Sequence, residues 1–403
     1  MQYFDQNLFI QKYITKRNVS FFINDITENE QQLTANISGK SILVIGGAGT
    51  IGSSFIKAIL PFKPGSLTVV DYSENGLTEL TRDLRSSYNE FIPKEYITYP
   101  FDFGGPIFEK LFRSSNYDIV ACFAAHKHVR SEKDHLAIEA MIRNNVFNTE
   151  KLLSLAADNP PQHFFSVSTD KAANPVNVMG ASKKLMEKIL MAYTETFKVT
   201  TARFANVAFS QGSLLFGFNH RMMKKQPISA PSDVKRYFVS PLESGQLCML
   251  ACILGETKDI FFPKLHADQM LTFSSIAENY LESLGLEPDY CSSEEEARQK
   301  AKSWNPDDKT YPVYFFKTDT SGEKSFEEFY DAADNILMDQ FSALGVVRNT
   351  EIPSIDKVKT ILGEFDKLFT SDSLKKADII NLLNDHLPDF SHIETGKSLD
   401  QKM

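Results

Sequence analysis

Residues 41–52 read SILVIGGAGTIG, a short β-branched apolar run that ends in closely spaced glycines. The run predicts a buried strand, and residues 50–60 have the spacing of an amphipathic helix. Gly46, Gly49 and Gly52 therefore fall in the turn between them, where glycine permits a tight turn and a close approach to a ligand. Because a helix N-terminus offers N–H donors and a favourable dipole to pyrophosphate, we predict a dinucleotide-binding loop.

Two acidic residues bear on which dinucleotide binds. Asp71 closes the next predicted strand, SLTVVD, where a carboxylate accepts both hydroxyls of the adenosine ribose. It repels a 2′-phosphate and no Arg follows it immediately, so NAD is favoured over NADP. Asp102, in YPFDF, is placed to meet the adenine amino group, with a loop-capping Asp as the alternative. The predicted cofactor-binding residues are Gly46, Gly49, Thr50, Ile51, Gly52, Asp71, Asp102, Ala124, Ala125 and Lys183.

The alternation of short apolar runs with helical periods continues beyond the first strand and predicts an α/β fold. We expect a Rossmann-type doubly wound parallel sheet, a smaller C-terminal substrate lobe and a helical C-terminal appendage. The predicted parts are a helical lead-in over residues 1–38, the NAD-binding domain over 39–206, a partly interleaved substrate-binding lobe over 207–346, and a helical extension over 347–403.

Composition excludes several classes of function. The 403 residues are 42% hydrophobic and 24% charged, which is ordinary for a globular protein, and the net charge of -9 argues against a nucleic-acid partner. The longest apolar run, residues 247–254, is far shorter than the roughly 20 residues that span a bilayer, and the N-terminus lacks a signal peptide's apolar core. We therefore predict a cytoplasmic protein without membrane insertion. The four cysteines lack CxxC spacing, and no metal cluster is visible.

Residues 168–183, STDKAANPVNVMGASK, carry a catalytic pattern with one unexpected residue. A Tyr four residues before a helical Lys becomes a base because the ammonium favours its phenolate form. Lys183 is present here, but Met179 stands at the Tyr position, and a thioether accepts no proton. Either the chemistry is lost or neighbouring side chains supply the base, and the candidates are Thr169, Asp170 and Lys171.

The glycine loop, ACFAAHKHV, NNV, STDKAANPVNVMGASK, RFANVAFSQGS, KRYF and GEKSFEE occur in this order over roughly residues 39–330. In these motifs the chain resembles the nucleotide-sugar 4,6-dehydratases of the extended short-chain dehydrogenases. It is most similar to the polysaccharide-biosynthesis branch that acts on UDP-N-acetylglucosamine, some members of which also carry Met at the Tyr position. The chain is expected to depart from the branch in two ways. The connection after KHV is longer here, and the sequence lacks the transmembrane part of the Met-bearing relatives, which are often long membrane proteins.

The resemblance implies a closed redox cycle. Hydride leaves C4 of the sugar for NAD, water is lost across C5 and C6, and hydride returns to C6. We assign Thr169 to orient the C4 oxygen, and Asp170 to take the C4 hydroxyl proton and later protonate the C6 hydroxyl. Lys171 is assigned the C5 proton, which requires its pKa to fall through burial and a nearby cation such as Lys183. A capped strand-to-helix turn is the alternative for this trio.

The resemblance also implies substrate contacts. Arg236 in KRYF is expected to meet the nucleotide diphosphate, with an ordinary surface Arg as the alternative. Asn145 is expected to support the active-site backbone, and His128 is equally well a core histidine. Glu323 and Lys324 either close the pocket or pair with each other. The predicted substrate-binding residues are Lys127, His128, Asn145, Asn206, Ser213, Arg236 and Glu323.

Several alternatives stay open. A GDP-linked N-acetylglucosamine is a second substrate, and retention or inversion at C5 is undecided. An epimerase or 4-reductase would depend on the missing Tyr, whereas an NAD-binding sensor would not need Asp170 and Lys171. A homodimer or larger homo-oligomer is expected through the long helices beside the site. The apolar stripe of the Lys183 helix, made by Leu185, Ile189, Leu190 and Tyr193, is interpreted as core or dimer seam.

Overall fold

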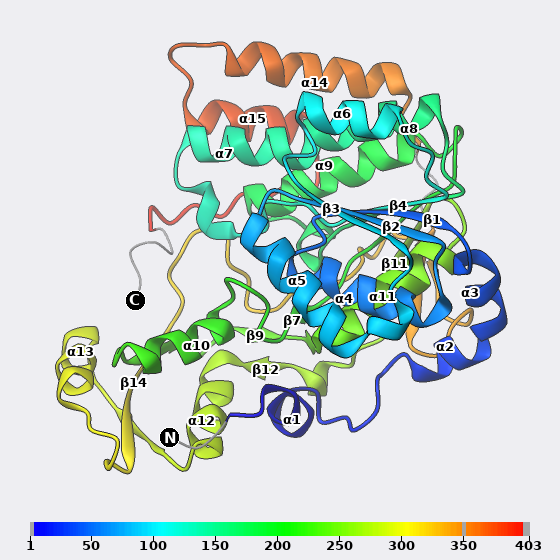
Figure 1. Ribbon diagram of the computed structural model, residues 1–403. Helices are drawn as coiled ribbons and strands as arrows, with labels where there is room; N and C mark the ends of the chain where they lie inside the picture. The colour runs from blue at the N-terminus through cyan, green and yellow to red at the C-terminus, as the bar shows by residue number, and fades with distance from the viewer. Residues whose placement is uncertain (1–3, 349–351, 398–403) are drawn as a thin grey trace.

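A nine-stranded sheet forms the centre of the computed structural model, which describes residues 4–348 and 352–397 (Figure 1). The strand order is β15-β16-β11-β6-β5-β4-β1-β2-β3, and the strands from β11 to β3 are parallel. This confirms the predicted α/β Rossmann-type sheet. The strands are β1 (Ser41–Ile45), β2 (Ser66–Asp71), β3 (Glu95–Pro100), β4 (Ile119–Cys122), β5 (His163–Val167), β6 (Val199–Ala202), β11 (Asp259–Pro263), β15 (Ile336–Leu337) and β16 (Leu344–Arg348).

Helices cover both faces of this sheet, because its central strands are apolar on both sides. One layer contains α3 (Glu30–Ile37), α4 (Thr50–Ile59), α5 (Glu74–Ser87) and α11 (Pro241–Leu254). The opposite layer contains α6 (Pro106–Arg113), α7 (His135–Ile142), α8 (Asn148–Asp158) and α9 (Val178–Ala192). The helix that carries Lys183 is α9, and it ends at Ala192.

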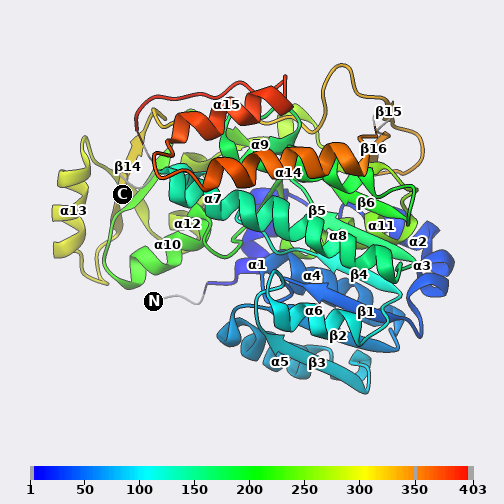
Figure 2. The same cartoon turned by 90° about the horizontal axis from the view of Figure 1, so that it is seen from above.

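The C-terminal helices form a further layer outside α7 and α9 (Figure 2). They are α14 (Ile355–Phe369) and α15 (Lys376–His386), and both lie within residues 347–403, for which the sequence predicts a helical extension. Phe365 and Leu383 are fully buried in the same apolar cluster as the α9 stripe. That stripe is therefore core within one chain. The last residues, ending LDQKM, lie outside the described residues.

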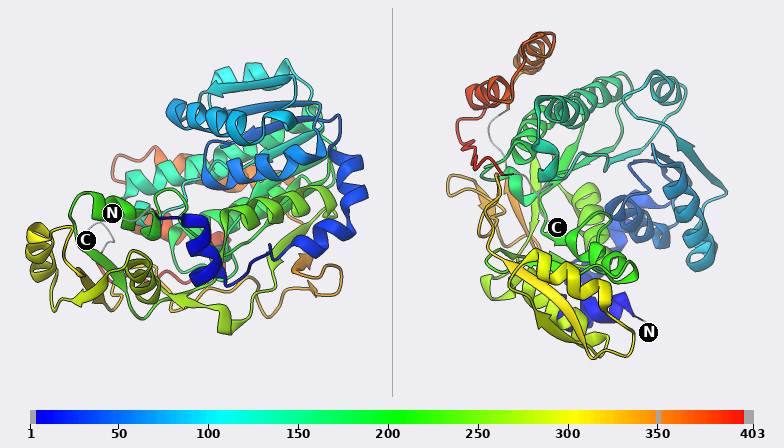
Figure 3. Two further views of the ribbon diagram at one scale, coloured as in Figure 1. Left: turned by 60° about the horizontal axis from the view of Figure 1, so that its bottom comes forward. Right: turned by 90° about the vertical axis from the view of Figure 1, so that its left-hand side faces the viewer.

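A smaller lobe projects from the carboxyl edge of the sheet (Figure 3). It contains α10 (Leu214–Met223), α12 (Phe273–Ser283), α13 (Glu294–Ser303) and a parallel sheet of β8 (Ile228–Pro231), β14 (Thr310–Phe316) and β13 (Glu287–Tyr290). Short strand pairs join it to the main sheet: β7 (Asn206–Val207) with β10 (Phe238–Val239), and β9 (Lys235–Arg236) with β12 (Leu271–Thr272). α11, β11, β15 and most of β16 fall in the range predicted for this lobe but belong to the main sheet and its helical layer.

The N-terminal residues are divided between the two parts. α1 (Gln6–Phe9) and the π-helical turn at Ile10–Thr15 place Phe9, Ile10 and Ile14 in the apolar cluster of the lobe. α2 (Ile23–Glu28) lies beside α3, and the buried Asp25 accepts backbone hydrogen bonds from Ser342 and Ala343. Within the described ranges, the helices are all too short or too polar to span a bilayer.

Close contact between α4 and α11 provides a test of this packing. A Cβ on Gly245 of α11 would lie 2.1 Å from the carbonyl oxygen of Ser54, whereas one on the exposed Gly363 of α14 would meet nothing within 4 Å. We predict that Gly245→Ala lowers the free energy of unfolding by about 1–3 kcal/mol through overpacking. Gly363→Ala, the matched control, raises it by up to about 1 kcal/mol. Urea denaturation measures both, and equal effects would contradict the packing.

Candidate active site

The glycine loop follows β1 in the chain, and in the sheet β1 lies next to β4. At this pair of strands the order in which successive strands are added to the sheet reverses. Gly46 has φ +75°, and a Cβ there would lie 2.5 Å from the backbone nitrogen of Ala124. A Cβ on Gly52 would lie 2.3 Å from the Gly46 carbonyl oxygen. Only glycine fits at these two positions. Gly49 N-caps α4 in extended backbone, and Ile51 packs partly buried on the core.

The two acidic residues predicted to read the cofactor lie at the carboxyl ends of neighbouring strands. Asp71 is buried, and its carboxylate accepts hydrogen bonds from the backbone N–H groups of Ala48 (3.0 Å) and Ser73 (2.9 Å). It therefore braces the glycine loop. Asp102 accepts a hydrogen bond from the Gly104 N–H (2.9 Å), which is the loop-capping arrangement that was its alternative interpretation.

Lys127 and His128 line the same edge of the sheet. Lys127 Nζ donates to the Gln211 carbonyl (3.1 Å), and the Gln211 N–H donates to Thr50 Oγ1 (3.0 Å). The loop around Gln211 thereby joins the glycine-loop helix to the segment after β4. A Cβ on Gly212 would lie 3.1 Å from His128 Nε2. Burial lowers the pKa of both Lys127 and His128, and neighbouring cations lower that of His128 further.

Asn145 and Ser213 support backbone through their side chains in this structure. The Asn145 side chain accepts from the His126 N–H (2.8 Å), and donates to the His126 carbonyl (2.9 Å) and Ser182 Oγ (3.1 Å). Asn145 thereby joins α9 to the segment after β4, which contains Ala124 and Ala125. Ser213 Oγ N-caps α10, and Asn206 lies in β7.

Four charged side chains meet just after β5, and we call them the buried charge cluster: Asp170, Lys171, Arg236 and Glu327. Lys171 Nζ lies 3.1 Å from Asp170 Oδ1 and 3.6 Å from Glu327 Oε1. Arg236 Nη2 lies 3.7 Å from the same Glu327 oxygen. Asp170, Arg236 and Glu327 are each 4% exposed. The Thr169 hydroxyl donates to Asp170 Oδ1 (2.8 Å), so the predicted trio is assembled at the strand end.

The charge state of Lys171 differs from the sequence-based expectation. Burial alone lowers the pKa of Lys171, but the carboxylates of Asp170 and Glu327 outweigh it and raise the pKa above its ordinary value. The expected fall was wrong because it counted a neighbouring cation and no second carboxylate. Burial and the charge of Asp170 raise the pKa of Glu327, against the opposing effect of Lys171. In the absence of substrate, Lys171 is therefore a protonated acid.

Lys183 is buried in α9, the helix that follows Asp170 and Lys171 in the chain. Its Nζ donates to the Val167 carbonyl at the end of β5 (3.0 Å) and lies 3.4 Å from Met186 Sδ. Burial lowers its pKa from 10.5 to about 8. Met179, at the Tyr position, is 3% exposed and packs in the apolar cluster of this face. Within the described residues, no group of His, Cys, Asp or Glu side chains is arranged to hold a metal ion.

Arg236 and Glu323 are directed toward each other. Arg236 Nη1 donates to the carbonyls of Lys235 (2.9 Å) and Lys324 (3.0 Å), and its Nη2 lies 3.7 Å from Glu323 Oε1. Glu323 also accepts from the Thr318 hydroxyl (2.6 Å). Glu323 thus pairs with Arg236, while Lys324 lies 3.7 Å from Glu328, so the pairing of Glu323 with Lys324 considered from the sequence does not occur.

Sequence reasoning missed Glu327 and a supporting pair, Arg203 and Glu187. Arg203 lies just after β6 and binds Glu187 of α9 through two hydrogen bonds (2.9 and 2.7 Å), with both side chains buried. Glu187 also accepts from the Ser168 hydroxyl, next to Thr169. Glu327 stands inside the quoted motif GEKSFEE, but nothing in a single sequence distinguishes it from Glu323 and Glu328.

The fold and the glycine loop define a Rossmann-type protein of the extended short-chain dehydrogenase fold. Residues 42–334 match the polysaccharide biosynthesis protein family, and the chain belongs to this family. An uncharacterized membrane protein of Methanocaldococcus jannaschii is 31% identical over 309 residues, 74% of this chain and 87% of that protein. The capsular polysaccharide biosynthesis protein CapD of Staphylococcus aureus is 26% identical over 74% of this chain, which spans about half (49%) of that relative's length.

Other relatives bear on the type of enzyme. A UDP-N-acetylglucosamine 4,6-dehydratase (inverting) of Campylobacter jejuni is 27% identical over 57% of this chain and 68% of its own. Two solved structures share the fold at 20% identity. Pen of Bacillus thuringiensis has a TM-score of 0.62 over 80% of this chain and 90% of its own. DesIV of Streptomyces venezuelae, a dTDP-glucose 4,6-dehydratase with NAD bound, has a TM-score of 0.55 over 72% and 88%.

The lowered pKa of Lys183 gives a prediction for stability. Between about pH 8 and pH 10.5 the unfolded chain holds a proton on Lys183 that the folded chain has lost, so stability rises with pH through this window. We predict that Lys183→Met, which removes this buried charge, is more stable than the native protein below pH 8 by about 3 kcal/mol. The difference disappears above pH 10.5. Urea denaturation of both proteins across this range measures it, and a pH-independent difference would contradict the assignment.

Proposed function

We propose that this chain is an NAD-dependent nucleotide-sugar 4,6-dehydratase that converts UDP-N-acetylglucosamine into its 4-keto-6-deoxy product. The glycine loop and Asp71 suit the pyrophosphate and ribose of NAD, and DesIV, which shares the fold, contains NAD. The Campylobacter relative, a dehydratase of this substrate, supports the choice of sugar. The observation that carries the proposal is the buried charge cluster at the end of β5, because it supplies groups able to carry protons in a chain that has Met179 at the usual Tyr position.

Asp170 fits the role of the missing tyrosine. Its carboxylate accepts the C4 hydroxyl proton as hydride leaves C4, and it then holds the proton that the departing C6 hydroxyl needs. Thr169, whose hydroxyl donates to Asp170 Oδ1 in the free protein, is assigned to orient the C4 oxygen in this proposal. One residue thus accepts and returns one proton.

Lys171 needs a different route to act as the C5 base, since it begins as an ammonium. Glu327, 3.6 Å away and with a raised pKa, is placed to take the Lys171 proton. Protonation of Asp170 removes one of the two carboxylates that hold the Lys171 proton, so the transfer to Glu327 becomes easier in the same step. The neutral amine then takes the C5 proton, and both transfers reverse when hydride returns to C6. Proton transfers balance over the cycle.

The direct test is proton NMR of the purified protein with UDP-N-acetylglucosamine in deuterated water. We expect a new C6 methyl signal with deuterium at C5, and the coupling pattern distinguishes retention from inversion. Turnover of only the GDP-linked sugar would show that this sugar, and not the UDP-linked one, is the substrate. A product that differs only at C4 would indicate an epimerase. NAD binding without turnover of any sugar nucleotide would overturn the proposal in favour of a sensor.

Two substitutions separate the proposed proton carriers. We predict that Asp170→Asn lowers C4 oxidation by at least about 100-fold, because general base catalysis contributes 10²–10⁴-fold. Glu327→Gln should still oxidise C4 but accumulate NADH and form little methyl product. Stopped-flow absorbance of NADH with NMR of the product measures the two steps. Glu328→Gln, next in the chain and 47% exposed in its side chain, is the matched control and keeps native rates. Near-native C4 oxidation by Asp170→Asn would contradict its role.

A further inference from the structure

The C-terminal tail, residues 391–397, lies across the loop that leads from the buried charge cluster into α9. The Ser391 N–H donates to the Pro175 carbonyl (3.1 Å), and the Ile393 N–H donates to the Val176 carbonyl (3.0 Å). These residues come after α15, at the far end of the described residues, and hydrogen-bond to the loop without forming a regular strand. The tail is therefore attached to the segment that follows Asp170 and Lys171.

The same tail is attached to the segment that carries Glu323 and Glu327. The Gly322 N–H donates to the Ile393 carbonyl (2.9 Å), and the Ser321 N–H donates to the Lys397 carbonyl (3.0 Å). The Ser321 hydroxyl also donates to Glu394 (2.7 Å). Ile393 thus hydrogen-bonds to one catalytic segment through its N–H and to the other through its C=O.

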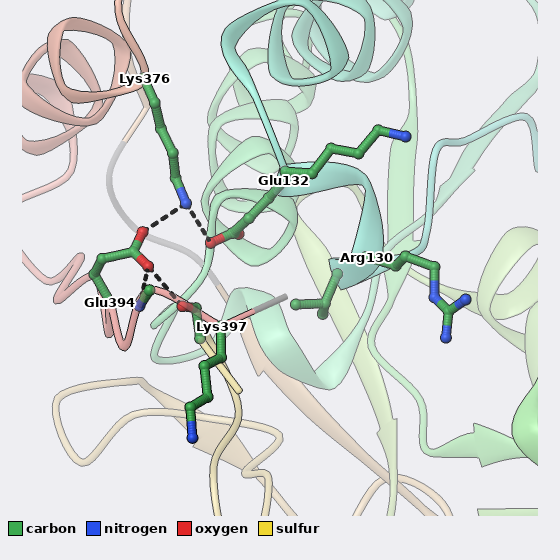
Figure 4. A pocket seen from close by; sticks show the side chains of 9 residues that line it. Arg130, Glu132, Lys376, Glu394 and Lys397 are labelled. Atoms are coloured by element: carbon green, nitrogen blue, oxygen red, sulfur yellow. Dashed lines mark hydrogen bonds and ion pairs between the residues drawn. The ribbon is translucent and has the colours of Figure 1, made fainter. Parts of the chain in front are cut away.

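Glu132 fixes the tail to the start of α9. Its Oε2 accepts the Val178 N–H (2.6 Å), which is the first backbone donor of the helix, and its Oε1 lies 2.8 Å from His392 Nε2. Glu132 is 5% exposed. Lys376 of α15 lies 3.8 Å from the same oxygen (Figure 4). A cavity of about 240 Å³ beside these side chains is bounded by both the tail and the segment after His128.

We propose that the tail is a positioning element of the active site, with Glu132 and His392 as its positioning residues. This inference rests on the proposed function. The pair of Lys171 with Glu327 joins two segments that are far apart in sequence, and the tail is hydrogen-bonded to both. It sets the separation of Asp170 and Lys171 from Glu327 without touching substrate or cofactor. Small displacements of reacting groups are costly, up to about 100-fold for 1 Å.

The extension contains a matched control. His386 Nε2 lies 2.7 Å from Glu364 Oε2, so it forms the same type of pair as His392 with Glu132, but it joins α15 to α14. We predict that His392→Ala combined with Ile393→Pro, which removes the N–H donor, lowers kcat at least about tenfold. KM and NAD affinity stay within about twofold, because the tail does not touch the nucleotide loop. His386→Ala keeps the native kcat. His392→Gln, which retains a donor for Glu132, recovers most of the rate lost in His392→Ala.

Hydrogen exchange separates failure of this inference from failure of the proposed function. If the native chain turns over no sugar nucleotide, the proposed function fails, but faster exchange of the Val178 and Gly322 amides in the double variant still supports positioning. Native exchange and native kcat in the double variant would overturn the inference. An equal loss of kcat in His386→Ala would also overturn it, since the effect would then be one of general stability.

Discussion

The ammonium group of Lys171 is enclosed with two carboxylates, and this pairing determines where the surrounding loops lie. A buried charge costs several kcal/mol unless partners compensate it, so Lys171 at the end of β5 requires carboxylates within reach. Asp170 comes from the same turn, whereas Glu327 comes from a segment beyond the smaller lobe. Arg236 adds a second cation, which balances the two carboxylates. These ion pairs connect the carboxyl edge of the sheet with the lobe and with the segment around Glu327.

A second buried ion pair, between Arg203 and Glu187, supports the turn that carries Asp170 and Lys171. Arg203 and Glu187 connect the end of β6 with the middle of α9, and Ser168 adds the end of β5 to the same pair. Arg203 also donates to the Phe329 carbonyl (3.0 Å), two residues beyond Glu327. A network in which each buried polar group has a partner favours one arrangement over alternatives, because any shift leaves a charge unpaired. The turn after β5 is thereby held by these buried side chains, and the tail hydrogen-bonds to the loop that follows it.

The sequence predicted those features that arise from local patterns. The glycine loop, the parallel strands and the place of Thr169 to Lys171 at a strand end follow from alternating apolar runs and turn residues within short windows. The pKa of Lys171 was mispredicted because Glu327 is distant in sequence and no periodicity connects them. The place of β11 in the main sheet was equally hidden, since its sequence, DIFFP, indicates a strand but not which sheet the strand joins. The support from Glu132 depends on the tail, so a local pattern contains no sign of it.

The contacts of the tail affect the order in which parts of the chain can fold during synthesis. Synthesis proceeds from the N-terminus, and residues 41–52 and 168–183 emerge from the ribosome long before residues 391–397 exist. The glycine loop needs only early neighbours, Ala124 and Asp71, for its geometry. The hydrogen bonds of Ile393, in contrast, form only after α15 has been made. The backbone around the nucleotide-binding loop is therefore available to fold early in synthesis, whereas the hydrogen bonds of Ile393 to the loop before α9 and to Gly322 form late.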